Sequence, residues 1–130
     1  MISYLSEETM IYKISKENVL NAVEICLEKP RYSVLIVTKS MVLPLGKMIV
    51  DCIGEILPRD TDLVKFNLNH ISFYNGSHID AVRISNGCRG RRAHMMLVDD
   101  KIDSETIERV LLPCIRKYKE DDFYDFSFKR

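Results

Sequence analysis

Two short runs of consecutive apolar residues constrain the fold of this chain more than any other feature. One run covers residues 33–38 (SVLIVT) and the other covers residues 95–98 (MMLV). Both runs are short for helices, and the first is rich in β-branched residues, which favour strands. A strand that is apolar on both faces must be covered on both sides, as in a parallel sheet between helices. The two runs therefore predict an α/β fold.

Amphipathic stretches supply helices that could cover such a sheet. Residues 16–28 carry apolar residues at helical spacing and follow Ser15, a favourable N-cap residue. Residues 45–56 carry a second apolar stripe. A third apolar face extends over residues 104–118, although Pro113 must kink or split that helix. We expect three helices.

A hairpin is predicted between the second helix and the second apolar run. Residues 69–74 and 77–84 flank Asn75 and Gly76, a pair that suits the positive φ angles of a tight hairpin turn. A short extended piece at residues 10–14 precedes the first helix. The element order predicts a mainly parallel sheet flanked by helices, with an inserted β-hairpin.

The whole chain has the length of one domain. Its 130 residues are 46% apolar, which is enough to bury a single core, so we expect one α/β domain over residues 1–130. Charged residues alternate with Phe123, Phe126 and Phe128 near the end of the chain. Residues 119–130 are therefore expected to form either an edge strand or a docking tail.

Charge and hydropathy limit the classes of partner. The 19 basic and 19 acidic residues cancel, so no field of the whole molecule attracts nucleic acid or a membrane surface. Charged residues interrupt the apolar runs, and no signal-peptide pattern is present. We expect a cytoplasmic protein with no membrane contact, located in the host cytosol if a phage encodes it.

Cysteines and histidines give no metal-binding pattern. The four cysteines are far apart, and no C-x-x-C pair occurs. The three histidines do not stand at zinc-ligand spacings from the cysteines. These residues are Cys26, Cys52, Cys88, Cys114, His70, His78 and His94. We expect reduced, mostly buried thiols and no cofactor. His78 and Asp80 share one face of the hairpin, but with no nucleophile recognised nearby they are interpreted as surface polar residues.

The second apolar run ends in an acidic pair, Asp99 and Asp100. A buried strand followed by two acids has the form of a Walker B element, in which one carboxylate holds Mg²⁺ and the next acid positions the attacking water. Many buried strands also end in Asp because carboxylates start turns. Open α/β sheets bind ligands at the carboxyl ends of their strands, so this pair marks a candidate catalytic site.

A dense basic cluster precedes the same run. Arg89, Arg91 and Arg92 stand in a glycine-containing segment, with Arg83 nearby on the hairpin. Arginines in such a loop could hold phosphates of a nucleic acid in a salt-sensitive way. Alternatively, the loop is solvated and pairs with the nearby acids Asp99, Asp100 and Asp103.

Several short motifs in order resemble the ATPase core of phage large terminase subunits, which package DNA. They are the strand, N-G-S turn and return strand at 71–79, the loop R-G-R-R-A at 89–93, the Walker B-like run 95–100, L-L-P at 111–113, and the strand and helix over 34–56. The resemblance implies a P-loop NTPase-like fold. It also implies that Asp99 would hold Mg²⁺ in an active ATPase, with Asp100 as its catalytic partner.

The departures from that family concern the nucleotide site. No G-x-x-x-x-G-K-[ST] sequence occurs, and the turn that corresponds to the P-loop, residues 14–18, has Lys16 but no glycine. Lys16 is thus the candidate nucleotide-binding residue, with Glu17 beside it to repel phosphate. Asp100 replaces the family's usual Glu, and its shorter side chain would position a water less well.

Three hypotheses follow. The first is a degenerate terminase-like phage protein that binds nucleic acid or a protein partner and does not hydrolyse ATP efficiently. The second is a minimal or split DNA-packaging ATPase that uses Lys16, Asp99 and Asp100 with Mg²⁺ and ATP. The third is a small α/β regulatory or inhibitory module that forms a homo-oligomer or binds another protein.

Overall fold

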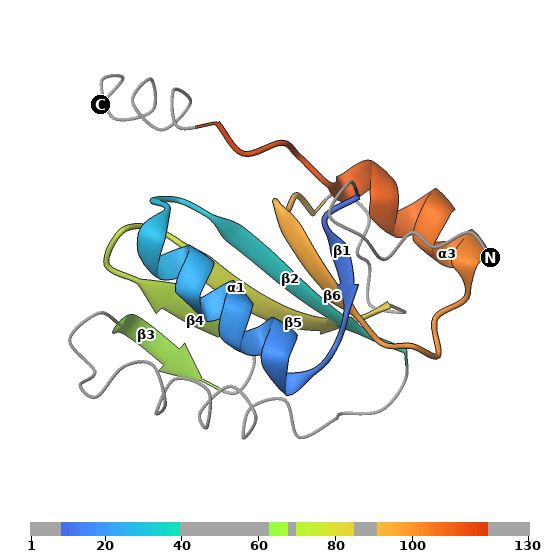
Figure 1. The fold of residues 1–130 in the computed structure, drawn as a ribbon, viewed down its shortest axis with the longest axis horizontal. Coiled ribbons are helices and arrows are strands. Elements are labelled where there is room, and N and C mark those ends of the chain that lie inside the picture. The colour runs from blue at the N-terminus through green and yellow to red at the C-terminus, as the bar shows by residue number, and fades with distance from the viewer. Residues whose placement is uncertain (1–8, 40–62, 68–69, 85–90, 120–130) are drawn as a thin grey trace.

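A six-stranded sheet forms the centre of the fold (Figure 1). The computed structural model describes residues 9–39, 63–67, 70–84 and 91–119. The strands lie in the order β1-β6-β2-β5-β4-β3. Neighbours from β1 to β5 in this order run parallel, and β4 runs antiparallel to both of its neighbours, β5 and β3. The strands are β1 (Ile11–Lys13), β2 (Ser33–Thr38), β3 (Leu63–Asn67), β4 (His70–Phe73), β5 (His78–Arg83) and β6 (Met95–Val98).

Helix α1 (Lys16–Glu28) covers one face of the sheet (Figure 1). Ser15 caps this helix, because its Oγ accepts a hydrogen bond of 3.1 Å from the N–H of Asn18. The buried side of the helix, Val19, Ala22, Val23 and Cys26, packs on the side chains that β2 and β6 direct to this face. The predicted bounds of this helix are confirmed.

The opposite face of the sheet is covered by the segment that follows β6. It begins as α3 (Ser104–Thr106), continues as a π-helical turn (Ile107–Leu111) and ends as a 3₁₀ turn (Leu112–Cys114). Ile102, Ile107, Leu111 and Cys114 are buried against Ile11, Leu35, Val37, Met96 and Val98. Alternate residues of β2 and β6 thus enter two different cores, which confirms that both strands are apolar on both faces.

The coarse architecture of the prediction is confirmed, and several details differ. β3 was not predicted, and the predicted helix at 45–56 lies outside the described residues, as do residues 120–130. The last helix was predicted to reach residue 118 but ends at Cys114, because Pro113 lacks the N–H that would continue it. Residues 115–119 are extended instead, with Ile115 bridged to Ala93.

The hairpin of β4 and β5 is confirmed, with a turn at residues 74–77. Gly76 alone of the predicted Asn75-Gly76 pair has a positive φ, 88°. Asn75 contributes through its side chain, which donates a 2.7 Å hydrogen bond to the carbonyl of Cys26 at the end of α1. In the part of the chain that the structure describes, no helix is long and apolar enough to cross a membrane.

Candidate functional site

The turn into α1 and the acidic pair lie together at the carboxyl edge of the parallel sheet. β1 and β6 are parallel neighbours, and the N–H of Ile14 donates to the carbonyl of Val98 at 3.1 Å. Asp99 begins directly after Val98, and its own N–H donates to Val37 at 2.9 Å. The structure therefore brings the turn that carries Lys16 next to Asp99.

Both carboxylate oxygens of Asp99 already accept backbone hydrogen bonds. The N–H of Lys39 lies 3.2 Å from Oδ2, and the N–H of Lys101 lies 3.1 Å from Oδ1. Burial alone would raise the pKa of Asp99, but these N–H groups outweigh it and hold the pKa below the ordinary aspartate value. Asp99 is thus an ionised group that ties the ends of β2 and β6 to their following turns, while Asp100 is exposed.

The turn at residues 14–18 is closed by its own side chains. Ser15 Oγ accepts the N–H of Asn18, and the Asn18 side chain donates to the carbonyl of Lys13 at 2.7 Å. Val19 N–H continues the helix by donating to Ser15 O at 2.9 Å. A phosphate loop instead keeps several N–H groups open toward the ligand. This turn is an ordinary capped helix start.

The arginine segment lies at the opposite edge of the sheet. Arg91 and Arg92 are exposed and precede the amino end of β6, whereas the acidic pair follows its carboxyl end; Arg89 lies outside the described residues. Over the described ranges, no ion pair joins Arg91 or Arg92 to Asp99, Asp100 or Asp103. The length of β6 separates the two groups, so the paired-loop interpretation is not supported.

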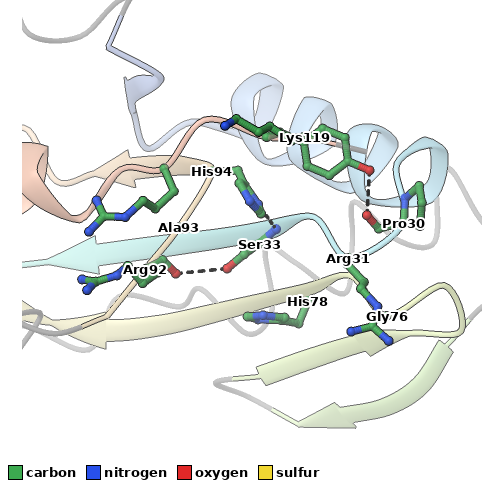
Figure 2. A pocket seen from close by; sticks show the side chains of 11 residues that line it. Pro30, Arg31, Ser33, Gly76, His78, Arg92, Ala93, His94 and Lys119 are labelled. Atoms are coloured by element: carbon green, nitrogen blue, oxygen red, sulfur yellow. Dashed lines mark hydrogen bonds between the residues drawn. The ribbon is translucent and has the colours of Figure 1, made fainter. Parts of the chain in front are cut away.

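A basic pocket of about 430 Å³ opens at this amino edge (Figure 2). It lies where β2, β5 and β6 begin, and the side chains that line it include Arg31, Arg92, Arg116, Lys119, His78 and His94. Of the described residues, no Asp or Glu lines it. Only Arg92 among these residues was predicted to bind phosphate.

The extended segment 115–119 forms one wall of the pocket. Its backbone follows residue 93, because Ala93 N–H donates to Cys114 O at 3.1 Å and Arg116 N–H donates to Ala93 O at 2.8 Å. Tyr118 fastens the far end, since its hydroxyl donates to the carbonyl of Pro30 at 2.7 Å. Arg116 and Lys119 are thereby placed beside residues that come much earlier in the chain.

Three aromatic rings pack together behind this wall. The ring centres of Tyr32, His94 and Tyr118 lie 5.2 to 5.3 Å apart. His94 Nδ1 accepts the N–H of Ser33 at 3.0 Å, which places the ring proton of the neutral imidazole on Nε2. Burial raises the pKa of Tyr32 to about 12, so its hydroxyl stays neutral. Two rings of the cluster, those of His94 and Tyr118, belong to residues that line the pocket.

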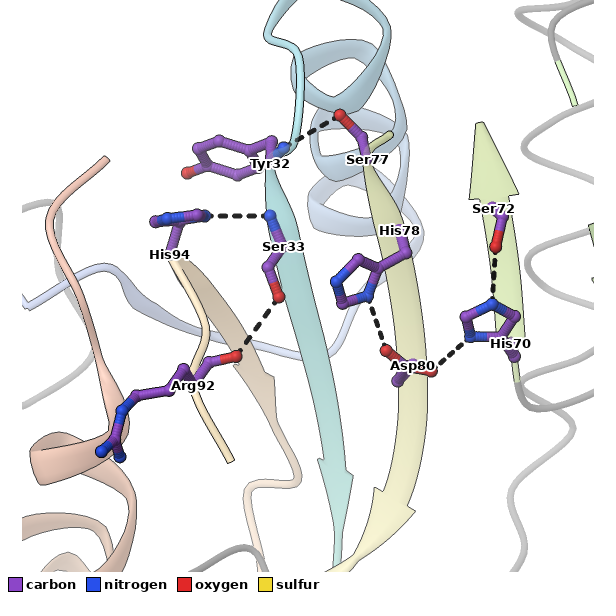
Figure 3. A network of polar contacts seen from close by, with 9 residues as sticks. All are labelled: Tyr32, Ser33, His70, Ser72, Ser77, His78, Asp80, Arg92 and His94. Carbon is purple, nitrogen blue, oxygen red and sulfur yellow. Dashed lines mark hydrogen bonds and ion pairs between the residues drawn. The ribbon is translucent and has the colours of Figure 1, made fainter. Parts of the chain in front are cut away.

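A second polar cluster lies across β4 and β5 (Figure 3). His70 Nδ1 lies 2.5 Å from Asp80 Oδ1, and His70 Nε2 lies 2.6 Å from Ser72 Oγ. His78 Nδ1 lies 2.7 Å from Asp80 Oδ2. The expectation that no serine or cysteine lies near His78 and Asp80 was therefore wrong, because Ser72 belongs to the same cluster. The hairpin register, which sets His70 opposite Asp80 and Ser72 opposite His78, could have revealed this cluster.

Ser72, His70 and Asp80 have the order of contacts found in a serine hydrolase triad, but the surroundings favour a structural role. β4 pairs with β3 on one side and with β5 on the other, so its backbone N–H groups face partner strands. Such N–H groups are poorly placed to stabilise an oxyanion. Asp80 is also shared with His78. The cluster is best explained as a tie between two strands.

Neither edge of the sheet presents a recognisable metal centre. Within the described ranges, no group of three or more His, Cys, Asp or Glu side chains is arranged to hold a metal ion. Cys26 and Cys114 are buried thiols that form no disulfide within the described residues, and Cys52 and Cys88 lie outside those ranges. No protein family, curated protein or solved structure matches this chain. What this protein does must therefore be inferred from its own residues.

Proposed function

We propose that this protein is a degenerate terminase-like phage protein that acts by binding nucleic acid and does not turn over ATP efficiently. The proposal combines the sequence motifs with two features of the fold. The carboxyl edge has the general placement of a nucleotide site, but among the residues described there the turn at 14–18 is not an open phosphate loop. The amino edge gathers basic side chains without acidic neighbours in the pocket lining.

The topology supports the first half of this proposal. In an ATPase of this type, the phosphate loop and the Walker B carboxylate must lie side by side so that Mg²⁺ can bridge them. The turn at residues 14–18 and Asp99 have that placement, because β1 and β6 are adjacent and parallel. This placement is the one that the resemblance requires, although any two neighbouring parallel strands bring the segments that follow them together in this way.

The hydrogen bonds inside the turn at residues 14–18 are the main observation against efficient ATP hydrolysis. Asn18 N–H is bonded to Ser15 Oγ, and the Asn18 side chain is bonded to the carbonyl of Lys13, so the backbone N–H of Asn18 is not open to a phosphate. Asp99 is likewise occupied by the N–H groups of Lys39 and Lys101. Binding ATP and Mg²⁺ in the manner of the family would require breaking these contacts, each worth about 1 kcal/mol or more.

Calorimetric titration with ATP and Mg²⁺, combined with a phosphate-release assay, tests this half. We expect phosphate release from the wild type to equal that from Asp99→Ala. Turnover that disappears in Asp99→Ala would instead establish a minimal or split ATPase.

Binding of oligonucleotides tests the other half. We expect fluorescence anisotropy to show weak binding that falls with added salt and is reduced in Arg91→Ala/Arg92→Ala. Arg109→Ala is the matched control, because Arg109 is exposed on the helical segment after β6 and pairs with Glu105. Absence of oligonucleotide binding, together with a mass in light scattering that rises with concentration, would favour the interaction module.

A further inference from the structure

We propose that the basic pocket at the amino edge is the site that holds phosphate groups of a nucleic-acid strand. This inference rests on the proposed function and names the part of the surface that would bind the nucleic acid. The place differs from the carboxyl edge, where open α/β sheets usually bind ligands. It also extends beyond the R-G-R-R-A motif, because of the two described arginines of that motif only Arg92 lines the pocket, and the other cations come from elsewhere in the chain.

The charge of the pocket comes from three separate parts of the chain. Arg31 follows α1, Arg92 precedes β6, and Arg116 and Lys119 belong to the extended segment after the last helix. The whole chain has a formal net charge of zero. Four cationic side chains surround a pocket that no carboxylate of the described residues lines, so this part of the surface is more positive than the molecule as a whole. A positive pocket favours an anionic ligand.

Three of these side chains retain donors for a ligand. Within the residues that the structure describes, the guanidinium of Arg92 and the ammonium of Lys119 have no hydrogen-bond or ion-pair partner. Arg116 donates through Nη1 to the carbonyls of Pro113 and Ile115, at 2.9 and 3.0 Å, which leaves Nε and Nη2. Arginine forks of this kind match the geometry of phosphate oxygens.

The backbone around the pocket is held in place before any ligand binds. Ser33 Oγ donates to the carbonyl of Arg92 at 3.3 Å, and the N–H of Arg116 is bonded to Ala93. Arg31 has a left-handed φ of 57°, and its N–H donates to Asn75 O at 3.1 Å. A Cβ on Gly76 would lie 3.0 Å from the Cγ of Arg31, so glycine leaves room for that side chain. Such preorganisation lowers the entropy lost on binding.

The spacing of the cationic side chains fits contact with several phosphate groups better than contact with a single phosphate. In Figure 2, Arg31 and Arg92 stand at two ends of the pocket, with Ser33 and His78 between them. Cations spaced along a depression can contact successive phosphates of a strand, whereas a single inorganic phosphate would reach only some of them. The ligand chemistry we assign is therefore the phosphodiester backbone.

The test measures the anisotropy of a short fluorescent oligothymidylate, and of a fluorescent duplex of the same length, with wild type, Arg116→Ala, Lys119→Glu and Arg92→Ala/Arg116→Ala. We expect the double variant to bind about tenfold more weakly or worse, and Lys119→Glu to weaken binding as well. Arg83→Ala is the matched control, because it removes an exposed arginine from the opposite end of β5. Circular dichroism checks the fold, and Lys119→Glu still tests the pocket if a change at Arg116 disturbs folding.

The outcomes separate this inference from the proposed function. If the wild type binds and the pocket variants match Arg83→Ala, the pocket assignment is overturned while nucleic-acid binding stands. If the wild type binds no oligonucleotide, single-stranded or duplex, both are overturned. Loss of affinity in the pocket variants for either form supports the site, and the tighter form identifies the ligand. Inorganic phosphate that displaces neither form at tens of millimolar would also support recognition of a strand.

Discussion

Asp80 is bonded to two histidine side chains at once. It is 20% exposed and accepts contacts from His70 and His78. Burial raises its pKa, but the two histidine hydrogen bonds outweigh burial, so the pKa lies below the ordinary aspartate value. A group whose pKa is lowered on folding stabilises the fold above its unfolded pKa, about 3.9, and that contribution is lost as the pH falls.

We therefore expect Asp80→Asn to lower the free energy of unfolding by about 1 to 2 kcal/mol at neutral pH, with a smaller effect near pH 3. Urea denaturation at several pH values measures this difference. Glu24→Gln is the control, because it removes an exposed carboxylate from α1. An equal loss at both pH values would show that Asp80 does not act through its charge.

Asp99 is a second instructive residue, because its position in the sequence suggested two different roles. Its position after a buried strand fits both a metal-binding carboxylate and a turn-starting Asp. The hydrogen bonds from Lys39 and Lys101 demonstrate the second role. They could not be read from the sequence, because Lys39 lies on a different strand end.

At the scale of secondary-structure elements, the N-terminus of α1 allows a quantitative prediction about stability. Ser15 supplies the only side-chain cap that the structure shows for this helix, through the 3.1 Å bond to Asn18. We expect Ser15→Ala to lower the free energy of unfolding by about 1 kcal/mol, as measured by chemical denaturation. Ser15→Asp keeps an acceptor at the cap and should retain most of the stability. Equal losses in the two variants would contradict a capping role.

The extended segment 115–119 allows a second prediction at this scale. Tyr118 holds it through the 2.7 Å bond to Pro30 and through contacts with the rings of Tyr32 and His94. We expect Tyr118→Phe, which loses only the hydroxyl, to speed hydrogen exchange at the N–H of Arg116, since local opening becomes easier by about 1 kcal/mol.

Tyr74→Phe is the matched control for that variant, because Tyr74 is 68% exposed on the hairpin turn. It should leave exchange at Arg116 unchanged. Protection at Arg116 that survives in Tyr118→Phe would mean that ring packing, and not the hydroxyl, fastens the segment.

For the whole molecule, the balance of charge makes the salt dependence of binding informative. The net charge of zero gives little long-range attraction, so release of counterions should come from the local contacts alone. If four cations of the pocket each meet a phosphate of a single strand, the slope of log K against log salt concentration should be about −3. Anisotropy titrations over a range of salt concentrations measure it.

The pocket variants provide the internal comparison for that slope. Arg92→Ala/Arg116→Ala should reduce its magnitude by about 1 to 2, whereas Arg83→Ala should leave it unchanged. A slope near zero in the wild type would contradict binding through phosphates at any surface of this protein.

The sequence by itself determined the elements whose signal is local. Two apolar runs specified the central strands β2 and β6, Ser15 and the apolar spacing specified α1, and the Asn75-Gly76 pair specified the hairpin turn. Each of these depends on residues within a few positions of one another, where periodicity, capping and turn chemistry act. The acidic pair and the arginine segment were also visible, as isolated candidates.

Only the tertiary structure decided which candidates meet. It put the turn at 14–18 beside Asp99 and separated both from Arg92 by the length of β6. It added Arg31, Arg116 and Lys119 to Arg92 in one pocket, and it joined His70 and Ser72 to Asp80. These juxtapositions follow from strand order, strand direction and register, which are set by packing between distant parts of the chain.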